Sequence, residues 1–317
     1  MDESRKHLIS TLGMLLGLGL FLWAGLQMSR KIEPYWTWFY CFAWWSFILF
    51  SQSLLHRRGA QSLLFEQPGR FFLLAFFSIS LWLVFEVWNF RLNNWEYHNV
   101  PGQITARWLG YAISFATVVP GLFTMEHLLD HFGVFGSLQT AGRAPNERFD
   151  GCLFWTGAIL LLLPLIWPRF FFPLVWGGFV LLLEPVNYRL GAPSLLRQWR
   201  EGSSRKVFLL LLSGLLCGLL WEFWNFWAGS RWRYTIPYVG WFKIFEMPVL
   251  GFLGFPPFAL ECYGMAGSFL LLFERIREQR SPSRRFYLQL LFLTGMIAFD
   301  LLVFYGIDHY TVAAYSR

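Results

Sequence analysis

Two matching clusters of a carboxyl and an amide group lie inside long apolar stretches of the chain. Glu86 and Asn89 belong to the string F-E-V-W-N-F, and Glu222 and Asn225 belong to W-E-F-W-N-F. A spacing of three residues places the acid and the amide of each pair on one face of a helix. A buried carboxyl group with a positioned neighbour is suited to donate or relay a proton, so both pairs are candidates for acid–base chemistry.

Further acids interrupt the apolar stretches at Glu126, Glu261 and Asp300. Ionisable groups inside a membrane are costly and are functional candidates by default. The sequence offers these acids no obvious Lys or Arg partner, which predicts that they are protonated, hydrogen-bonded or neutralised by a cation. We predict catalytic roles for Glu86, Glu222, Glu126 and Glu261. Interhelical hydrogen bonds that fix helix register are the alternative for Glu86, Glu222 and their two Asn partners, and the sequence leaves it open.

Aromatic side chains flank the duplicated acids. Such rings around a carboxyl group can line a pocket for an apolar isoprenoid-like ligand, such as a lipid, a quinone or a carotenoid, or they can be rigid packing. The predicted ligand-binding set is Asn89, Asn225, Trp82, Trp88, Trp221, Trp224 and Asp300. No cofactor is identified by any motif.

One pair of histidines has metal-ligand spacing. His127 and His131 are four residues apart and could face one metal or haem. At the corresponding places the second half of the chain has Cys262 and Ala266. We therefore predict no metal site, although the sequence does not decide whether the two histidines bind a metal or haem.

The elements that must position these residues are transmembrane helices. Hydrophobic residues make up 56% of the 317 residues and charged residues only 14%, against roughly a quarter in soluble domains, which excludes an ordinary soluble enzyme. Apolar runs long enough to span a bilayer recur along the chain and predict an all-α polytopic bundle. About nine spans are expected, at 8–28, 35–55, 70–92, 108–128, 151–168, 170–188, 205–227, 250–273 and 285–307.

The basic residues indicate orientation rather than nucleic-acid binding. The net charge is +7, but most Lys and Arg residues fall between apolar runs, on the side that would be cytoplasmic if the N-terminus is. This bias predicts a cytoplasmic N-terminus and a C-terminus outside the cell membrane.

An internal repeat relates the two halves. The matches around Glu86 and Glu222 continue to Trp95-x-Tyr97 and Trp232-x-Tyr234 downstream. We predict two parallel four-span repeats, 1–140 and 141–280, related by an axis along the membrane normal, and an additional span within 281–317. The segments at about 103–114 and 239–251 are expected to be interfacial or re-entrant, since Pro248 would disturb a continuous span.

The strings W-E-F-W-N, W-x-Y-x-x-P and E-M-P-V-L-G-F-L-G-F, within residues 205–275, resemble a family of uncharacterised multi-pass bacterial membrane proteins. The resemblance implies a bacterial inner (plasma) membrane and carries no activity. Two functional classes remain: a protein that binds or modifies an isoprenoid-like ligand by acid–base chemistry, and a non-catalytic subunit, scaffold or cation/proton-coupled transporter. The expected partners are membrane lipid, an apolar ligand and other membrane subunits.

Overall fold

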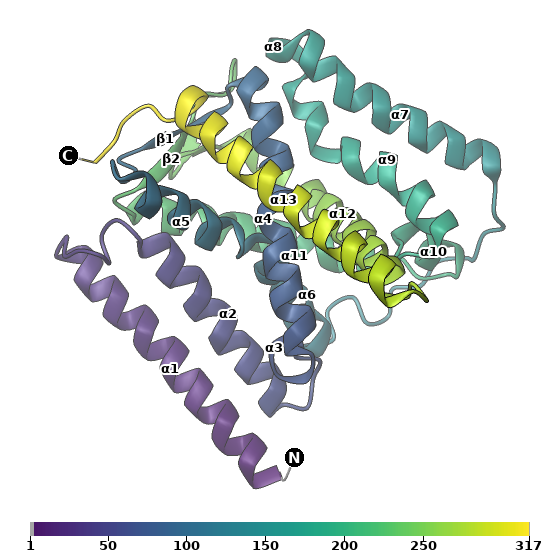
Figure 1. Ribbon diagram of the computed structural model, residues 1–317, viewed down its shortest axis with the longest axis horizontal. Helices are drawn as coiled ribbons and strands as arrows, with labels where there is room; N and C mark the ends of the chain where they lie inside the picture. The colour runs from purple at the N-terminus through teal and green to yellow at the C-terminus, as the bar shows by residue number, and fades with distance from the viewer. Residues whose placement is uncertain (1–2, 317) are drawn as a thin grey trace.

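The computed structural model describes residues 3–316, and most of them are helical (Figure 1). The strands are short and form two separate two-stranded sheets. The elements are α1 (Glu3–Ser29), α2 (Phe39–Arg57), α3 (Leu63–Glu66), α4 (Pro68–Leu92), β1 (Trp95–His98), α5 (Ile104–Phe115), α6 (Val118–His131), α7 (Glu147–Ile166), α8 (Pro168–Phe171), η1 (Phe172–Leu174), α9 (Val175–Leu190), α10 (Leu195–Arg200), α11 (Arg205–Trp227), β2 (Arg231–Tyr234), β3 (Lys243–Ile244), β4 (Met247–Pro248), η2 (Val249–Gly254), α12 (Phe255–Arg277) and α13 (Pro282–Tyr310).

Within residues 3–316, eight helical segments are long and apolar enough to cross a membrane. The prediction of an all-helical, multi-pass membrane protein is therefore confirmed at this level. The expected span at 35–55 corresponds to α2, which is not one of the eight. Polar and amphipathic side chains such as Trp45, Ser46 and Gln52 lower the mean hydropathy of α2.

Helices α1 and α2 form an antiparallel pair at one side of the molecule (Figure 1). A Cβ atom at Gly17 would collide with the backbone of α2 at Ser46 and Phe50, so glycine permits this close approach. The opposite face of α1 leaves Leu15, Leu16 and Leu22 exposed. In a membrane protein such a face is covered by lipid or by another membrane helix.

The two segments expected to be interfacial or re-entrant differ from each other in secondary structure. Residues 104–115 form helix α5, which continues into α6 after a break at Ala116 and Thr117. The break lies where Pro120 cannot offer an N–H to the carbonyl of Ala116. Residues 243–254 form the β3–β4 hairpin and η2, and α12 begins with prolines in its first turn.

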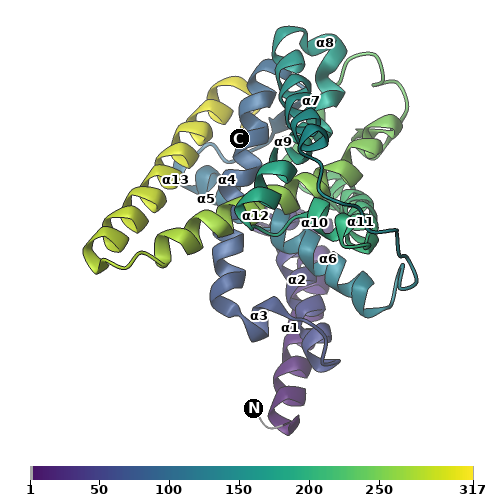
Figure 2. The same cartoon turned by 90° about the vertical axis from the view of Figure 1, so that its right-hand side faces the viewer.

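Strands β1 and β2, 136 residues apart in sequence, join as an antiparallel ribbon. Trp95 faces Tyr234 across the ribbon, and Tyr97 faces Trp232. The other edge of β1 bonds to the segment after α13: the N–H of Tyr97 donates to the carbonyl of Thr311 at 2.7 Å. The ribbon lies at the opposite end of α4 from α3 (Figure 1), and Figure 2 shows α3 and α4 from the perpendicular direction. We call these the ribbon end and the α3 end.

A buried N-cap at α10 provides a stability test. The Ser194 hydroxyl accepts a hydrogen bond from the N–H of Arg197 at 3.2 Å and donates one to Glu184 at 2.7 Å. We expect Ser194→Ala to lower the free energy of unfolding by about 2 kcal/mol. The matched control is the exposed cap of α13: Ser281→Ala should cost about 0.5 kcal/mol. If detergent-unfolding curves showed that Ser194→Ala and Ser281→Ala lower the free energy of unfolding equally, the prediction would be contradicted.

Candidate functional site

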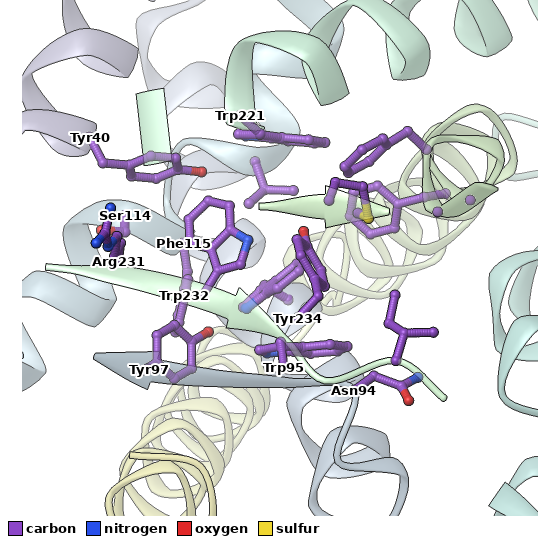
Figure 3. Close-up of a pocket in the computed structure, with 18 of the residues that line it drawn as sticks. Tyr40, Asn94, Trp95, Tyr97, Ser114, Phe115, Trp221, Arg231, Trp232 and Tyr234 are labelled. Carbon is purple, nitrogen blue, oxygen red and sulfur yellow. The ribbon is translucent and has the colours of Figure 1, made fainter. Parts of the chain in front are cut away.

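A cavity of about 410 Å³ opens at the ribbon end, between the ribbon and helices α2, α4, α5, α11 and α12 (Figure 3). Its walls are mainly aromatic and aliphatic. The aromatic lining consists of Trp38, Tyr40, Trp82, Trp95, Tyr97, Tyr111, Phe115, Phe172, Trp176, Trp221, Trp232, Tyr234, Phe255 and Phe258. The cavity is therefore suited to an apolar ligand.

The ribbon supplies four of these rings from one of its faces. Side chains alternate along a strand, and residues opposite each other in an antiparallel pair share a face. The register therefore gathers Trp95, Tyr97, Trp232 and Tyr234 on the cavity side. Figure 3 shows these four side chains on the strands, with Tyr40 and Trp221 elsewhere in the lining. The spacing W-x-Y thus produces an aromatic wall.

Glu86 lies behind this wall and is fully buried. Its Oε1 accepts hydrogen bonds from the Tyr97 hydroxyl at 2.5 Å, from Trp82 Nε1 at 2.9 Å and from Trp95 Nε1 at 3.0 Å. Its Oε2 has no partner among the described residues. Three donors that line the cavity therefore connect it to one buried carboxyl group.

Glu222 repeats the arrangement with fewer donors. It is also fully buried, and its Oε1 accepts a hydrogen bond from the Tyr234 hydroxyl at 2.8 Å. Four residues before Glu222 the chain has Gly218, whereas Trp82 lies four residues before Glu86. The second carboxyl group is consequently held less tightly than the first.

The two tyrosines keep their protons over the physiological range. Burial, followed by the adjacent carboxyl groups, raises the pKa of Tyr97 and that of Tyr234 well above the ordinary value. Both hydroxyls therefore act as hydrogen-bond donors toward Glu86 and Glu222. Together with the indole N–H groups of Trp82 and Trp95, they connect the lining of the cavity to these acids.

The two asparagines bind the backbone of the connections that follow their helices. Asn89 Nδ2 donates to the carbonyl of Trp95 at 2.9 Å, and its Oδ1 accepts from the N–H of Asn94 at 2.8 Å. Asn225 makes the equivalent pair of bonds, both at 2.9 Å, with the backbone of Trp232. The amides therefore fix the strands to α4 and α11.

Of the four predicted tryptophans, Trp82 and Trp221 line the cavity. Trp88 instead donates to the carbonyl of Leu161 at 3.1 Å, and Trp224 packs against Trp44 with ring centroids 4.8 Å apart. Asp300 lies outside the cavity lining and accepts a hydrogen bond from Ser80 at 2.7 Å, which connects α13 to α4.

The remaining predicted acids have structural partners. Glu126 forms an ion pair with Lys206 at 2.7 Å, so the expectation that these acids lack a basic partner is wrong for Glu126. The pair was missed because the two residues are 80 positions apart and meet only when α6 packs on α11.

Glu261 accepts hydrogen bonds from backbone N–H groups at a break in helix α9. Its Oε1 accepts from the N–H groups of Gly177 at 2.7 Å and Phe179 at 2.9 Å. Gly177 has a φ of 132°, a conformation that glycine adopts without the strain of a side chain. The carboxyl group thus satisfies the free N–H groups at the start of a helical segment.

The two histidines lie in different surroundings. Nε2 of His127 lies 3.7 Å from Oε2 of Glu126, while the ring of His131 is tilted by 60° against that of Phe132, with the ring centroids 5.3 Å apart. Between residues 3 and 316, no cluster of three or more His, Cys, Asp or Glu side chains is placed to hold a metal ion.

One polar cluster at the cavity was not predicted. Arg107 binds Asp308 through two hydrogen bonds at 2.6 and 2.7 Å, and Trp108 and Tyr111 donate to the same carboxylate. Arg107 and Tyr111 also line the cavity. The only signal in the sequence was an arginine within an otherwise apolar segment.

Comparison with protein-family models, with curated proteins and with solved structures finds no match to this chain.

Proposed function

We propose that this protein binds an apolar, isoprenoid-like ligand in the aromatic cavity and acts on it by acid–base chemistry. The observation that carries the proposal is the pair of tyrosines that line the cavity and whose hydroxyls donate to fully buried carboxyl groups. An apolar cavity with a few convergent polar groups is the usual form of a small-molecule site.

The chemistry follows from the order of the groups. The ligand contacts the hydroxyls of Tyr97 and Tyr234, and Glu86 and Glu222 lie one hydrogen bond further from the cavity. As a tyrosine oxygen takes a proton from the ligand, it gives its own proton to the carboxylate behind it; the reverse transfer returns a proton to the ligand. The tyrosines are the catalytic residues in this scheme, and Trp82 and Trp95 position Glu86.

The proposed setting is a bacterial inner membrane, with nine spans if α2 is counted and with the N-terminus cytoplasmic and the C-terminus outside. Two four-span repeats, 1–140 and 141–280, are related by an axis along the membrane normal, and 281–317 adds the last span. The antiparallel pairing of two like strands and the two Glu–Tyr–Asn arrangements support this layout. Lipid surrounds the bundle.

Filling the cavity tests ligand binding. Ser114 lines the cavity, while its neighbour Ile113 does not and is partly exposed. We expect Ser114→Phe to weaken binding of geranylgeraniol or a short-chain quinone at least about tenfold, because the added ring excludes ligand atoms from the site. Titration in detergent, followed by tryptophan fluorescence, measures this. Ile113→Phe should bind as the wild type does; equal binding by all three proteins would contradict the proposal.

Isosteric replacements test the chemistry separately from binding. Glu86→Gln and Glu222→Gln should retain the bound ligand and reduce proton exchange between ligand and deuterated water about 100-fold or more. Tyr97→Phe and Tyr234→Phe should do the same. Unchanged exchange in all four variants, with loss of a copurifying membrane subunit, would favour the scaffold instead. Substrate-dependent proton flux in liposomes that these changes abolish would favour a transporter.

A further inference from the structure

A second cavity, of about 240 Å³, lies at the α3 end between α4, α6, α11 and α12. Unlike the aromatic cavity, it has a lining in which about half of the residues are polar, and among these Arg70 and Lys206 contribute positive charges and Glu126 one negative charge. The two cavities share no lining residue, and along α12 their nearest lining residues, Phe258 and Tyr263, are five positions, about 7.5 Å, apart. The second cavity is therefore a distinct site.

The two cations enter this cavity from the starts of two different helices. Arg70 is in the first turn of α4 and Lys206 in the first turn of α11, 136 residues later, which is also the separation of Glu86 and Glu222. Lys206 is held by Glu126 at 2.7 Å and lies over the ring of Tyr263, 5.6 Å from its centroid. Its ammonium group is thus fixed at the cavity, while Arg70 is exposed at the rim.

A histidine forms part of the same wall. The His127 side chain lines the cavity and is only 10% exposed; its Nδ1 is enclosed by protein and has no hydrogen-bond partner within the described chain, and its Nε2 lies 3.7 Å from Glu126 Oε2. Gln61, Gln67 and Tyr263 offer further donors along the same wall.

We propose that this cavity binds a phosphodiester monoanion joined to an apolar group, as in a phospholipid headgroup. Two cations and one carboxylate leave one positive charge in excess, which matches the single charge of a phosphodiester. The apolar part of the lining, Leu74, Phe123 and Leu270, is suited to the start of a lipid chain. Arg70 and Lys206 contact the phosphate. This site does not depend on the function proposed for the aromatic cavity.

The test uses the full-length protein, delipidated in mild detergent, with three probes in native mass spectrometry. We expect phosphatidylglycerol to bind and neutral diacylglycerol to bind at least about tenfold more weakly, because it lacks the phosphate. Soluble glycerophosphoglycerol distinguishes the source of the ligand. Weak binding of it would assign the site to a membrane lipid, and binding as tight as that of the lipid would assign it to a soluble phosphodiester. Equal binding of diacylglycerol and phosphatidylglycerol would overturn the proposal.

Variants place the binding at this cavity. Arg70→Gln and Lys206→Gln should each weaken phosphatidylglycerol binding about tenfold, the usual effect of one charge-assisted hydrogen bond. Arg277→Gln, an exposed arginine at the end of α12 and outside the cavity, is the matched control and should leave binding unchanged. Lys206→Gln also breaks the ion pair with Glu126. Gln67 is exposed, so Gln67→Glu removes the excess positive charge of the cavity without disturbing buried groups. Wild-type binding by Arg70→Gln and Gln67→Glu would overturn the proposal.

Discussion

Asn89→Ala is expected to lower the free energy of unfolding by about 3–5 kcal/mol, because it leaves several buried backbone groups without a partner. The amide binds the backbone N–H groups of Asn94 and Trp95 and the carbonyl of Trp95. All of these groups lie in the buried connection between α4 and β1. Equilibrium unfolding in mixed detergent micelles, followed by tryptophan fluorescence, measures the change.

Two comparisons make the result specific. Asn225 makes two such bonds in a less buried environment, so Asn225→Ala should cost about 2 kcal/mol. Gln103 is exposed at the same end of the molecule and its side chain does not cap α5, so Gln103→Ala should have an effect within about 0.5 kcal/mol. If Asn89→Ala were as mild as Gln103→Ala, the amide would not be the group that holds β1 to α4.

Arg107→Met is the second change with a large expected effect, about 3–5 kcal/mol of lost stability. The side chains of Arg107 and Asp308 are only 7% and 12% exposed, so removal of the guanidinium leaves a poorly solvated carboxylate. It also removes the donor to the carbonyls of Pro101 and Gly102. The same unfolding assay applies, and the aromatic cavity should lose ligand affinity as α5 separates from α13.

A double-mutant cycle isolates the charge effect from the loss of packing. Arg107→Met combined with Asp308→Leu removes both charges, so the double variant should be less destabilised than the sum of the two single variants by at least about 1 kcal/mol. Strict additivity of the two changes would show that the ion pair contributes no coupling, and would contradict the prediction.

The multi-pass helical class could be predicted from the sequence, whereas most contacts of the acids could not. Hydropathy reflects how each segment interacts with lipid, a property local to the segment. The partners of Glu126 and Glu261 depend on packing between distant segments. Lys206 is 80 residues from Glu126, and the N–H groups of Gly177 and Phe179 are free to bind Glu261 only because α9 is broken there.

The aromatic cavity was predictable in part. Trp82 and Trp221 were expected at a ligand site, and both line the cavity. Tyr97 and Tyr234 were not, because rings near the ends of spans usually belong to an interfacial belt. Their spacing from the neighbouring tryptophans has the period of a strand, and this was the signal that a two-stranded ribbon forms one wall.

The ribbon also constrains the order in which the protein can be completed during synthesis. Strand β1 lies between β2 and the segment at Thr311–Ser316, so both of its edges are bonded by residues that the ribosome makes much later. Until residues 231–234 emerge, the backbone of β1 must be solvated by water or held by a chaperone or the insertion machinery. The aromatic wall is therefore assembled only after the second half of the chain has entered the membrane.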